Sequence, residues 1–272
     1  MGLLDSIFGD KPNQKNIEKL VLKVKERYAQ PEYRREAMDK LLAWGTPEAF
    51  AALLGRFTVV VQSPHWDEEE KRWLVDELAS HGDPARAALK IFLAKDDHVA
   101  FAAKALRQLS PSAEVWIDDL ITALHARPPS DHRTTQGKAE LINTLVDAEA
   151  PQSGALGGPR GAGAAPGEDK VKTAPKAVAA IKPYLNDHAD DVQMATLDGL
   201  DKLFPAANDN DKAAVSAALR EMVVDDARSA RVLRQAAGVM AHHKLTVDAL
   251  KPLAPAVAED FVVKDGVLAS SR

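Results

Sequence analysis

One helical pattern recurs along most of this chain of 272 residues and limits what it can fold into. Its clearest copy is PEYRREAMDKLLAWGTPEAFAALLGRF, residues 31–57. The apolar residues of its first half share one helical stripe: Tyr33, Ala37, Leu41 and Trp44. Gly45 predicts the end of that helix. Thr46 and Pro47 predict the start of a second helix. The threonine hydroxyl can cap free backbone N–H groups, and proline suits the first helical position because no N–H is needed there. The segment therefore predicts two helices joined by a tight turn.

The same spacing returns at five later places. With Tyr33 as position 0, the stripe positions 4, 8 and 11 recur from these starts: Glu70, His98, Gly137, Val192 and Val232. The starts are separated by 37, 28, 39, 55 and 40 residues, which suits a two-helix repeat with loops of variable length. One helix pair cannot bury its own stripe, so neighbouring copies must stack. We therefore expect an all-α chain, built as an α-α superhelix (a solenoid) of about six helix pairs.

The remaining helices are expected between these copies. A first helix is expected over 13–29, and the second helices of the pairs over 47–61, 84–93, 112–126, 174–185, 209–224 and 247–259. The long fourth interval contains PQSGALGGPRGAGAAPGEDKVK, residues 151–172, whose Gly, Ala and Pro content predicts a flexible linker. This linker would divide the repeats into a first part, 13–150, and a second part, 173–260.

The two chain ends depart from the repeat. Residues 1–12 form an amphipathic segment that is too short to be a stable helix alone. We expect it to dock on the first repeat; a weak membrane or partner anchor is the alternative. In residues 261–272 the pair Asp265-Gly266 is a hairpin signal. Because an isolated hairpin is only marginally stable, we expect a frayed C-terminal tail.

Composition narrows the function. The net charge is −5, with 20 basic and 24 acidic residues in 1–150 and 15 and 16 in 151–272. Neither half carries the basic surface that nucleic-acid binding needs, so we expect no nucleic-acid partner. The absence of cysteine excludes disulfides, thiol catalysis and Cys-based metal sites. The sequence has no apolar run of ~20 residues and no secretory leader, so the cytoplasm is the expected compartment.

No motif points to a cofactor or a metal. The histidines lack a spacing such as HExxH, and the glycines of 151–172 lack the lysine of a phosphate-binding loop. His81 and His243 are expected at helix C-terminal ends, where a cation is favourable. Three acidic groups fall at predicted helix starts, where carboxylates cap N–H groups: Asp67–Glu70, Asp190 with Asp191, and Asp225 with Asp226.

Two units, PEYRREAMDKLLAWGTPEAFAALLGRF and KAVAAIKPYLNDHADDVQMATLDGLDKL, resemble HEAT repeats, the two-helix repeats of the armadillo-like α-solenoid class. In that family the first helix often carries a proline, matched by Pro183, and an acidic turn precedes a Val-Arg pair. Here the turn reads Asp191, Val192, Gln193, without the arginine. Position 1 of the six copies reads Arg34, Lys71, Val99, Lys138, Gln193 and Leu233, so only the first half keeps a basic column. The resemblance implies a non-enzymatic scaffold or adaptor that binds a protein partner through its concave face.

The candidate partner-binding residues lie opposite the stripe, at positions 2, 6 and 9. They are Arg35, Asp39, Arg72, Asp76, Lys104 and Arg107. Arg and Asp four residues apart on one helix can pair, so this face is expected to be mixed in sign. Trp66 joins the set, because an indole on an apparent loop beside an apolar run suits a docking surface.

The same resemblance leaves an enzyme as the alternative function, either bilin-lyase-like or DNA-glycosylase-like. Glycosylases of this class place aromatic residues beside an acid. The pairs Trp73 with Asp76 and Trp116 with Asp119 resemble that arrangement. The absence of a basic groove argues against it.

Overall fold

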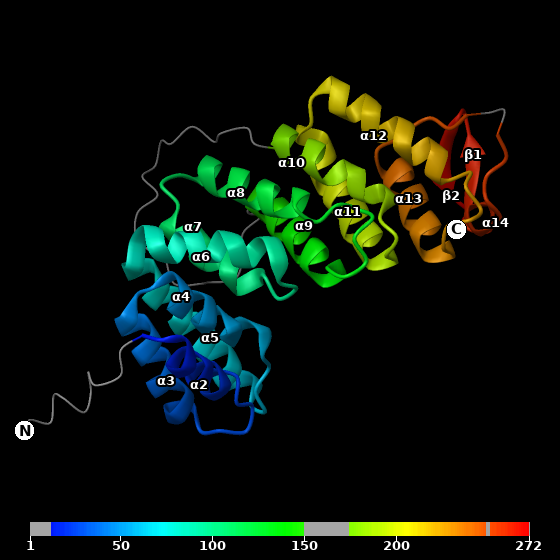
Figure 1. Cartoon of the computed structure of the whole chain (residues 1–272). Helices are drawn as coiled ribbons and strands as arrows, with labels where there is room; N and C mark the ends of the chain where they lie inside the picture. Colours follow the sequence, from blue (N-terminus) through cyan, green and yellow to red (C-terminus); the bar gives the residue numbers. More distant parts are fainter. Residues whose placement is uncertain (1–11, 150–173, 249–250, 272) are drawn as a thin grey trace, which may run out of the picture. The chain divides into compact units, whose positions relative to one another are not determined.

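The computed structural model describes residues 12–149, 174–248 and 251–271. Over these residues the chain is mostly helical, which confirms the all-α prediction at the level of fold class (Figure 1). Two predicted segments, the N-terminal one up to residue 11 and the linker at 151–172, lie outside the described residues. No described helix is both long enough and apolar enough to cross a membrane.

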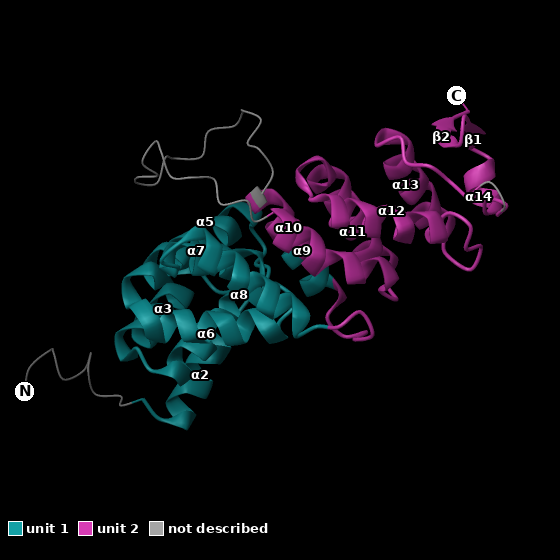
Figure 2. Cartoon of the chain, turned by 90° about the horizontal axis from the view of Figure 1, so that it is seen from above, with its two compact units in different colours: residues 1–127, 136–141 teal, residues 128–135, 142–272 magenta. Residues whose placement is uncertain are grey.

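The helices are α2 (Gln14–Val24), α3 (Pro31–Trp44), α4 (Pro47–Leu54), α5 (Pro64–Leu78), α6 (Gly82–Lys95), α7 (Ala100–Leu109), α8 (Ala113–His125), α9 (Thr135–Glu149), α10 (Ala174–Ile181), α11 (Asp190–Leu203), α12 (Asp209–Met222), α13 (Ala230–His242) and α14 (Pro255–Ala258). Strands β1 (Phe261–Lys264) and β2 (Val267–Ser270) form an antiparallel hairpin. Two compact units divide the chain: unit 1 is residues 1–127 and 136–141, and unit 2 is residues 128–135 and 142–272 (Figure 2).

The turn between α3 and α4 has the predicted form. Gly45 ends α3 with a φ of 60°, a left-handed conformation that favours glycine. The Thr46 hydroxyl accepts a hydrogen bond from the N–H of Ala49 at 3.2 Å, and Pro47 is the first residue of α4. Local chemistry alone therefore sets both helix ends.

Four positions of the repeat are buried in all six copies. With Tyr33 as position 0, they are positions 1, 4, 5 and 8, the i, i+3, i+4, i+7 spacing of one helix face. The residues at position 5 are Met38, Val75, Ala103, Ile142, Leu197 and Ala237. Burial at positions 4 and 8 was predicted, whereas Tyr33 itself is 44% exposed. The buried face is therefore turned towards position 1 relative to the predicted stripe.

Within each unit the helices pack in two rows. In unit 1, α2, α4, α6 and α8 contact one another in sequence, and α3, α5 and α7 do the same. In unit 2, α10 packs on α12 and α11 packs on α13. Contacts between α3 and α4, α6 and α7, α10 and α11, and α12 and α13 join the rows. The first helices α3, α5 and α7 thus lie beside one another in unit 1, as do the first helices α11 and α13 in unit 2.

A buried ion-pair network lies between α3 and α5 and includes the 3-10 turn Gly55–Thr58 after α4. Arg34 donates from Nε to Glu70 at 3.0 and 3.1 Å, and Arg56 donates to Glu70 at 2.7 and 2.9 Å. Arg56 also pairs with Asp67 at 2.7 Å, and Lys71 pairs with Asp67 at 2.6 Å. All five side chains are buried, and together they carry three positive and two negative charges. Buried charges of this kind are tolerated only when paired and hydrogen-bonded.

This network corrects the prediction that Asp67 to Glu70 act as helix caps. Helix α5 begins earlier, at Pro64, and Ser63 is its capping residue. Asp67 lies in the first turn, but its Oδ1 accepts from Arg56 and from the N–H of Val61 at 3.2 Å. Burial raises the pKa of Asp67, and the hydrogen bonds from Lys71, Arg56 and Val61 together outweigh it, so the pKa lies below its usual value.

Other predictions about the helices are also wrong. The first helix ends at Val24 rather than at residue 29, and Tyr28, which lies within the expected range, is 80% exposed. Trp66 lies in the first turn of α5 and not on a loop. The helix expected over 247–259 is reduced to the four residues of α14.

The C-terminal tail is a hairpin, not a frayed end. Asp265 and Gly266 both have positive φ, 52° and 78°, as a two-residue hairpin turn requires. Strand β2 packs on α13, and Leu268 is buried. The turn chemistry was visible in the sequence, but the apolar support comes from a helix far away in the chain.

Candidate functional site

A pocket of about 640 Å³ opens on unit 1 at the side of α3 and α5. Two tryptophans and an arginine line it, together with the rim residues Gln30, Pro31, Glu32, Glu69 and Glu70. The tryptophans are Trp66 and Trp73, and the arginine is Arg35. Arg35 of α3 and Trp66 of α5, both predicted to bind a partner, meet in this pocket because the two helices pack side by side.

Arg35 is stacked inside this pocket. Its guanidinium carbon lies 3.1 Å from the centroid of the Trp73 ring, which is a cation–π contact. Arg35 also pairs with Asp39 at 3.4 Å, as the four-residue spacing predicted. The Trp73 indole N–H donates to Glu77 at 2.8 Å. These contacts fix the indole and the guanidinium before any ligand arrives.

Trp66 is the exposed wall of the pocket. The residue is 48% exposed, which is high for a tryptophan. It lies in the first turn of α5, which Ser63 caps. Glu70, at the pocket lining, is committed to Arg34 and Arg56. The other acids at the rim are Glu32 and Glu69, both exposed, and Glu69 lies 3.7 Å from Nε2 of His65. The pocket therefore offers an apolar ring face beside carboxylates.

The other candidate residues lie on the same exposed face but do not join the pocket. Arg72 pairs with Glu68 at 2.9 Å instead of the expected Asp76, whose Oδ1 accepts from Gln108. Lys104 lies 4.8 Å from the Phe101 ring centroid. Arg107 lies 5.5 Å from the ring centroid of Trp116. The predicted surface is thus mixed in sign, with each cation held by a local partner.

The acid–aromatic pairs behind the glycosylase alternative serve other contacts. Asp119 is bound by Arg86 and by Lys90, the latter at 2.7 Å. The Trp116 indole N–H donates to the carbonyl of Ala103 at 3.0 Å. These contacts hold the side chains between neighbouring helices.

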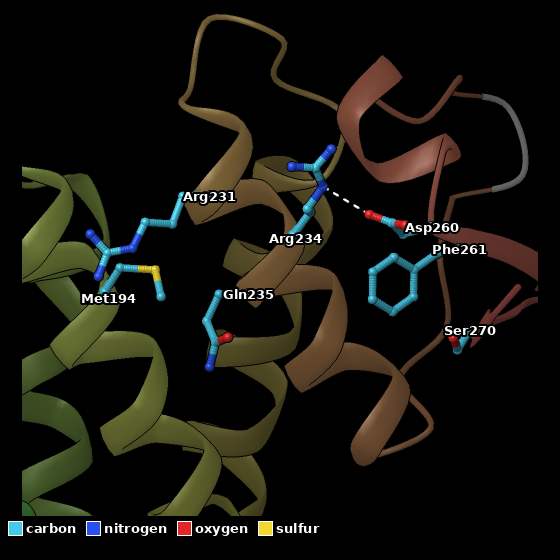
Figure 3. A pocket seen from close by; sticks show the side chains of 7 residues that line it. All are labelled: Met194, Arg231, Arg234, Gln235, Asp260, Phe261 and Ser270. Atoms are coloured by element: carbon cyan, nitrogen blue, oxygen red, sulfur yellow. Dashed lines mark ion pairs between the residues drawn. The ribbon is translucent and has the colours of Figure 1, made fainter. Parts of the chain in front are cut away.

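Unit 2 has its own pocket, of about 530 Å³, on α11, α13 and the hairpin (Figure 3). Its lining residues are Met194, Arg231, Arg234, Gln235, Asp260, Phe261 and Ser270. Met194 and Arg234 occupy position 2 of their copies, the position of Arg35 in the first copy. Arg234 pairs with Asp260 at 2.8 Å and with Glu259 at 2.7 Å, and Arg231 pairs with Asp191 at 3.0 Å.

Sequence reasoning missed one cluster of possible metal ligands. Asp201 of α11 lies between His242 and His243 at the end of α13. The useful signal would have been the repeat frame, because Asp201 is position 9 of the fifth copy and the histidines are positions 10 and 11 of the sixth. His243 does lie at a helix end, as predicted, where it caps α13.

Compared with known protein families, curated proteins and solved structures, the chain matches none of them significantly.

Proposed function

We propose that this protein is a non-enzymatic scaffold or adaptor of the HEAT-like α-solenoid kind, which binds a protein partner on the face formed by α3, α5 and α7. Two features support the repeat architecture. The same four positions are buried in all six copies, and within each unit like helices pack beside like helices. In such repeat proteins the residues that packing does not require are free to recognise a partner.

The observation that carries the proposal is the half-exposed Trp66 in a preformed pocket with Trp73 and Arg35. Tryptophan and arginine are the residue types most often responsible for binding energy at protein interfaces. Leaving an indole in water is unfavourable, and covering it would bury apolar surface. The rim acids Glu32 and Glu69 favour a partner segment that presents an apolar side chain flanked by basic residues.

The test compares the wild type with two variants used as bait proteins, each of which replaces one exposed residue. Trp66→Ala removes the pocket wall, and Ile91→Ala is the matched control, because Ile91 is a comparably exposed apolar residue on α6, in the other row of unit 1. A partner captured by the wild type and by Ile91→Ala, but not by Trp66→Ala, is purified and titrated. We expect its Kd to rise at least about 30-fold in Trp66→Ala, the size of an interface hot spot.

A second test of the same face uses three of the predicted partner-binding cations. Replacing Arg35, Arg72 and Lys104 together by alanine should weaken capture of the same partner while the circular dichroism spectrum is retained. Capture that is unchanged in both this triple variant and Trp66→Ala would contradict the assignment of this face.

A further inference from the structure

Three side chains with metal-binding chemistry converge in unit 2, at the C-terminal ends of α11 and α13. Asp201 lies two residues before the end of α11, His242 is the last residue of α13, and His243 is its C-cap. Helices α11 and α13 pack against each other, so the two helix ends lie side by side. The cluster is separate from the pocket of Figure 3, whose lining includes none of these residues.

The geometry of the cluster is compact. Oδ1 of Asp201 lies 2.7 Å from Nδ1 of His242 and 2.9 Å from Nε2 of His243. The three atoms all lie within 4.8 Å of one another. The ring of His243 packs against the ring of Phe204, with the two ring centroids 4.5 Å apart. Two imidazole nitrogens and one carboxylate oxygen therefore lie close enough together to bind one ion.

Hydrogen bonding alone would use the carboxylate as the acceptor for both imidazole N–H groups. We infer that these three groups instead form a binding site for one divalent transition-metal ion, with Zn²⁺ the best match. Zinc binds nitrogen and carboxylate oxygen at about 2.0–2.2 Å in a tetrahedron, which places neighbouring ligand atoms about 3.3 Å apart. The observed separations reach that value with side-chain shifts of about half an ångström.

The exposure of the ligands leaves room for the remaining coordination. The side chain of His242 is 67% exposed, so its ring can adjust and water can occupy the fourth position. The side chain of His243 is only 11% exposed and supplies the fixed ligand. Two imidazoles with one carboxylate favour Zn²⁺, Ni²⁺ or Cu²⁺ over Mg²⁺ and Ca²⁺, which prefer oxygen ligands.

The bound ion would connect α11 to the end of α13. Because the ligands come from residues 41 and 42 positions apart, an unfolded chain does not present them together. An ion that binds the folded form alone raises the thermal unfolding midpoint of the protein. The site thus stabilises the junction of two successive repeat copies in unit 2.

The test uses full-length protein without a histidine tag. Titration with Zn²⁺ in a calorimeter should give one ion per chain, and Co²⁺ as a probe should give the strong visible absorption of a tetrahedral site. His242→Ala and Asp201→Asn should each weaken binding by about 100-fold or more, since even second-layer residues of metal sites cost 10–100-fold. His242 is exposed, so its replacement leaves the fold intact.

The matched control removes the other histidine pair of unit 2. His132 and His188 have ring centroids 3.8 Å apart, and His188 pairs with Asp187. The double variant His132→Ala, His188→Ala should bind Zn²⁺ as tightly as the wild type. The inference is overturned if the wild type shows no one-to-one binding, if His242→Ala and Asp201→Asn bind as well as the wild type, or if only the control loses the ion.

Discussion

Unit 1 and unit 2 bury the same positions of the repeat but differ in the chemistry at position 1. In unit 1 this position is Arg34, Lys71 and Lys138, with one apolar member, Val99. In unit 2 it is Gln193 and Leu233, both uncharged and both buried. Position 1 is therefore buried whatever its chemistry, and the charges of Arg34 and Lys71 are accepted there because Glu70 and Asp67 pair with them.

The partners of position 1 differ accordingly. Arg34 binds the carboxylate of Glu70, 36 residues later. Gln193 donates to the carbonyl of Asp187 at 2.6 Å and accepts from Arg228 at 3.0 Å. Charged networks lose more than neutral ones when one member is removed, because a buried charge is then left without a partner. Stability measurements on matched variants of the two units can test this difference.

The largest effect is expected at Glu70. Glu70→Gln keeps the side-chain volume but leaves three buried cations facing one carboxylate, so we expect a loss of about 3–5 kcal/mol in the free energy of unfolding of unit 1. Gln193→Met in unit 2 removes two hydrogen bonds without exposing a net charge, and should cost about 1–2 kcal/mol. Urea unfolding measures both.

The two units can be followed separately in that experiment. All four tryptophans, Trp44, Trp66, Trp73 and Trp116, belong to unit 1, so tryptophan fluorescence reports unit 1 while circular dichroism reports both units. Equal losses in the two variants would contradict a special cost for the charged network.

Features of the fold that depend on neighbours in the sequence could be predicted, and features that depend on residues far apart in the sequence could not. The end of α3 and the start of α4 depend on Gly45, Thr46 and Pro47, which act on their own neighbours, and the sequence predicted both. The other end of α4 was expected at residue 61 and lies at Leu54. The burial of Arg34 could not be predicted in this way, because an isolated arginine in a helical pattern indicates a surface position. The carbonyls of Glu26 and Ala29 accept from Arg34, and the carboxylate that neutralises its charge is that of Glu70, which belongs to the next copy.

The candidate sites show the same limit. Arg35 was predicted to face away from the core, and it does, but its stacking on Trp73 depends on how α3 packs beside α5. The hairpin after α14 was signalled by Asp265 and Gly266, yet the support of α13 was needed to hold it. Local patterns therefore gave the helices and the exposed face, while the partners of individual side chains required the packing.

The next largest effect concerns two helical glycines, Gly137 of α9 and Gly238 of α13, which differ in the space available for a side chain. A Cβ on Gly137 would clash with Nη1 of the buried Arg127 and would lie 2.9 Å from the carbonyl of Asp96, whereas a Cβ on Gly238 meets nothing within 4 Å. Gly137→Ala should therefore destabilise unit 1 by about 1–3 kcal/mol. Gly238→Ala in α13 should stabilise unit 2 by about 0.5–1 kcal/mol, because alanine favours the helix.

Thermal unfolding of both alanine variants checks this pair. A stabilising Gly137→Ala would show that Arg127 moves aside freely, and would contradict the close packing at the start of α9.

Acid should weaken unit 1 through Asp67. Its pKa is lowered in the folded protein, so its ion pairs contribute stability above the unfolded-state pKa of about 3.9 and lose it as the pH falls through the lower folded value. Asp67→Asn lacks this contribution at every pH. The difference in unfolding free energy between the wild type and Asp67→Asn should therefore be constant from pH 7 to about 5 and shrink as the pH falls below about 4. A difference that grew on acidification would have the wrong sign.

The smallest effects are expected on the exposed faces. Arg72 pairs with Glu68 along α5, and Arg231 pairs with Asp191 between α13 and α11, each at about 3 Å in water-accessible positions. Arg72→Ala and Arg231→Ala should each cost about 0.3–0.5 kcal/mol at low salt and close to nothing at about 1 M salt, because ions screen exposed pairs. The loss in Glu70→Gln should persist at that salt concentration, since the buried network is shielded from ions. If Arg72→Ala instead destabilised unit 1 as strongly as Glu70→Gln, Arg72 would be required for the stability of the repeat, and its side chain would not be free to bind a partner.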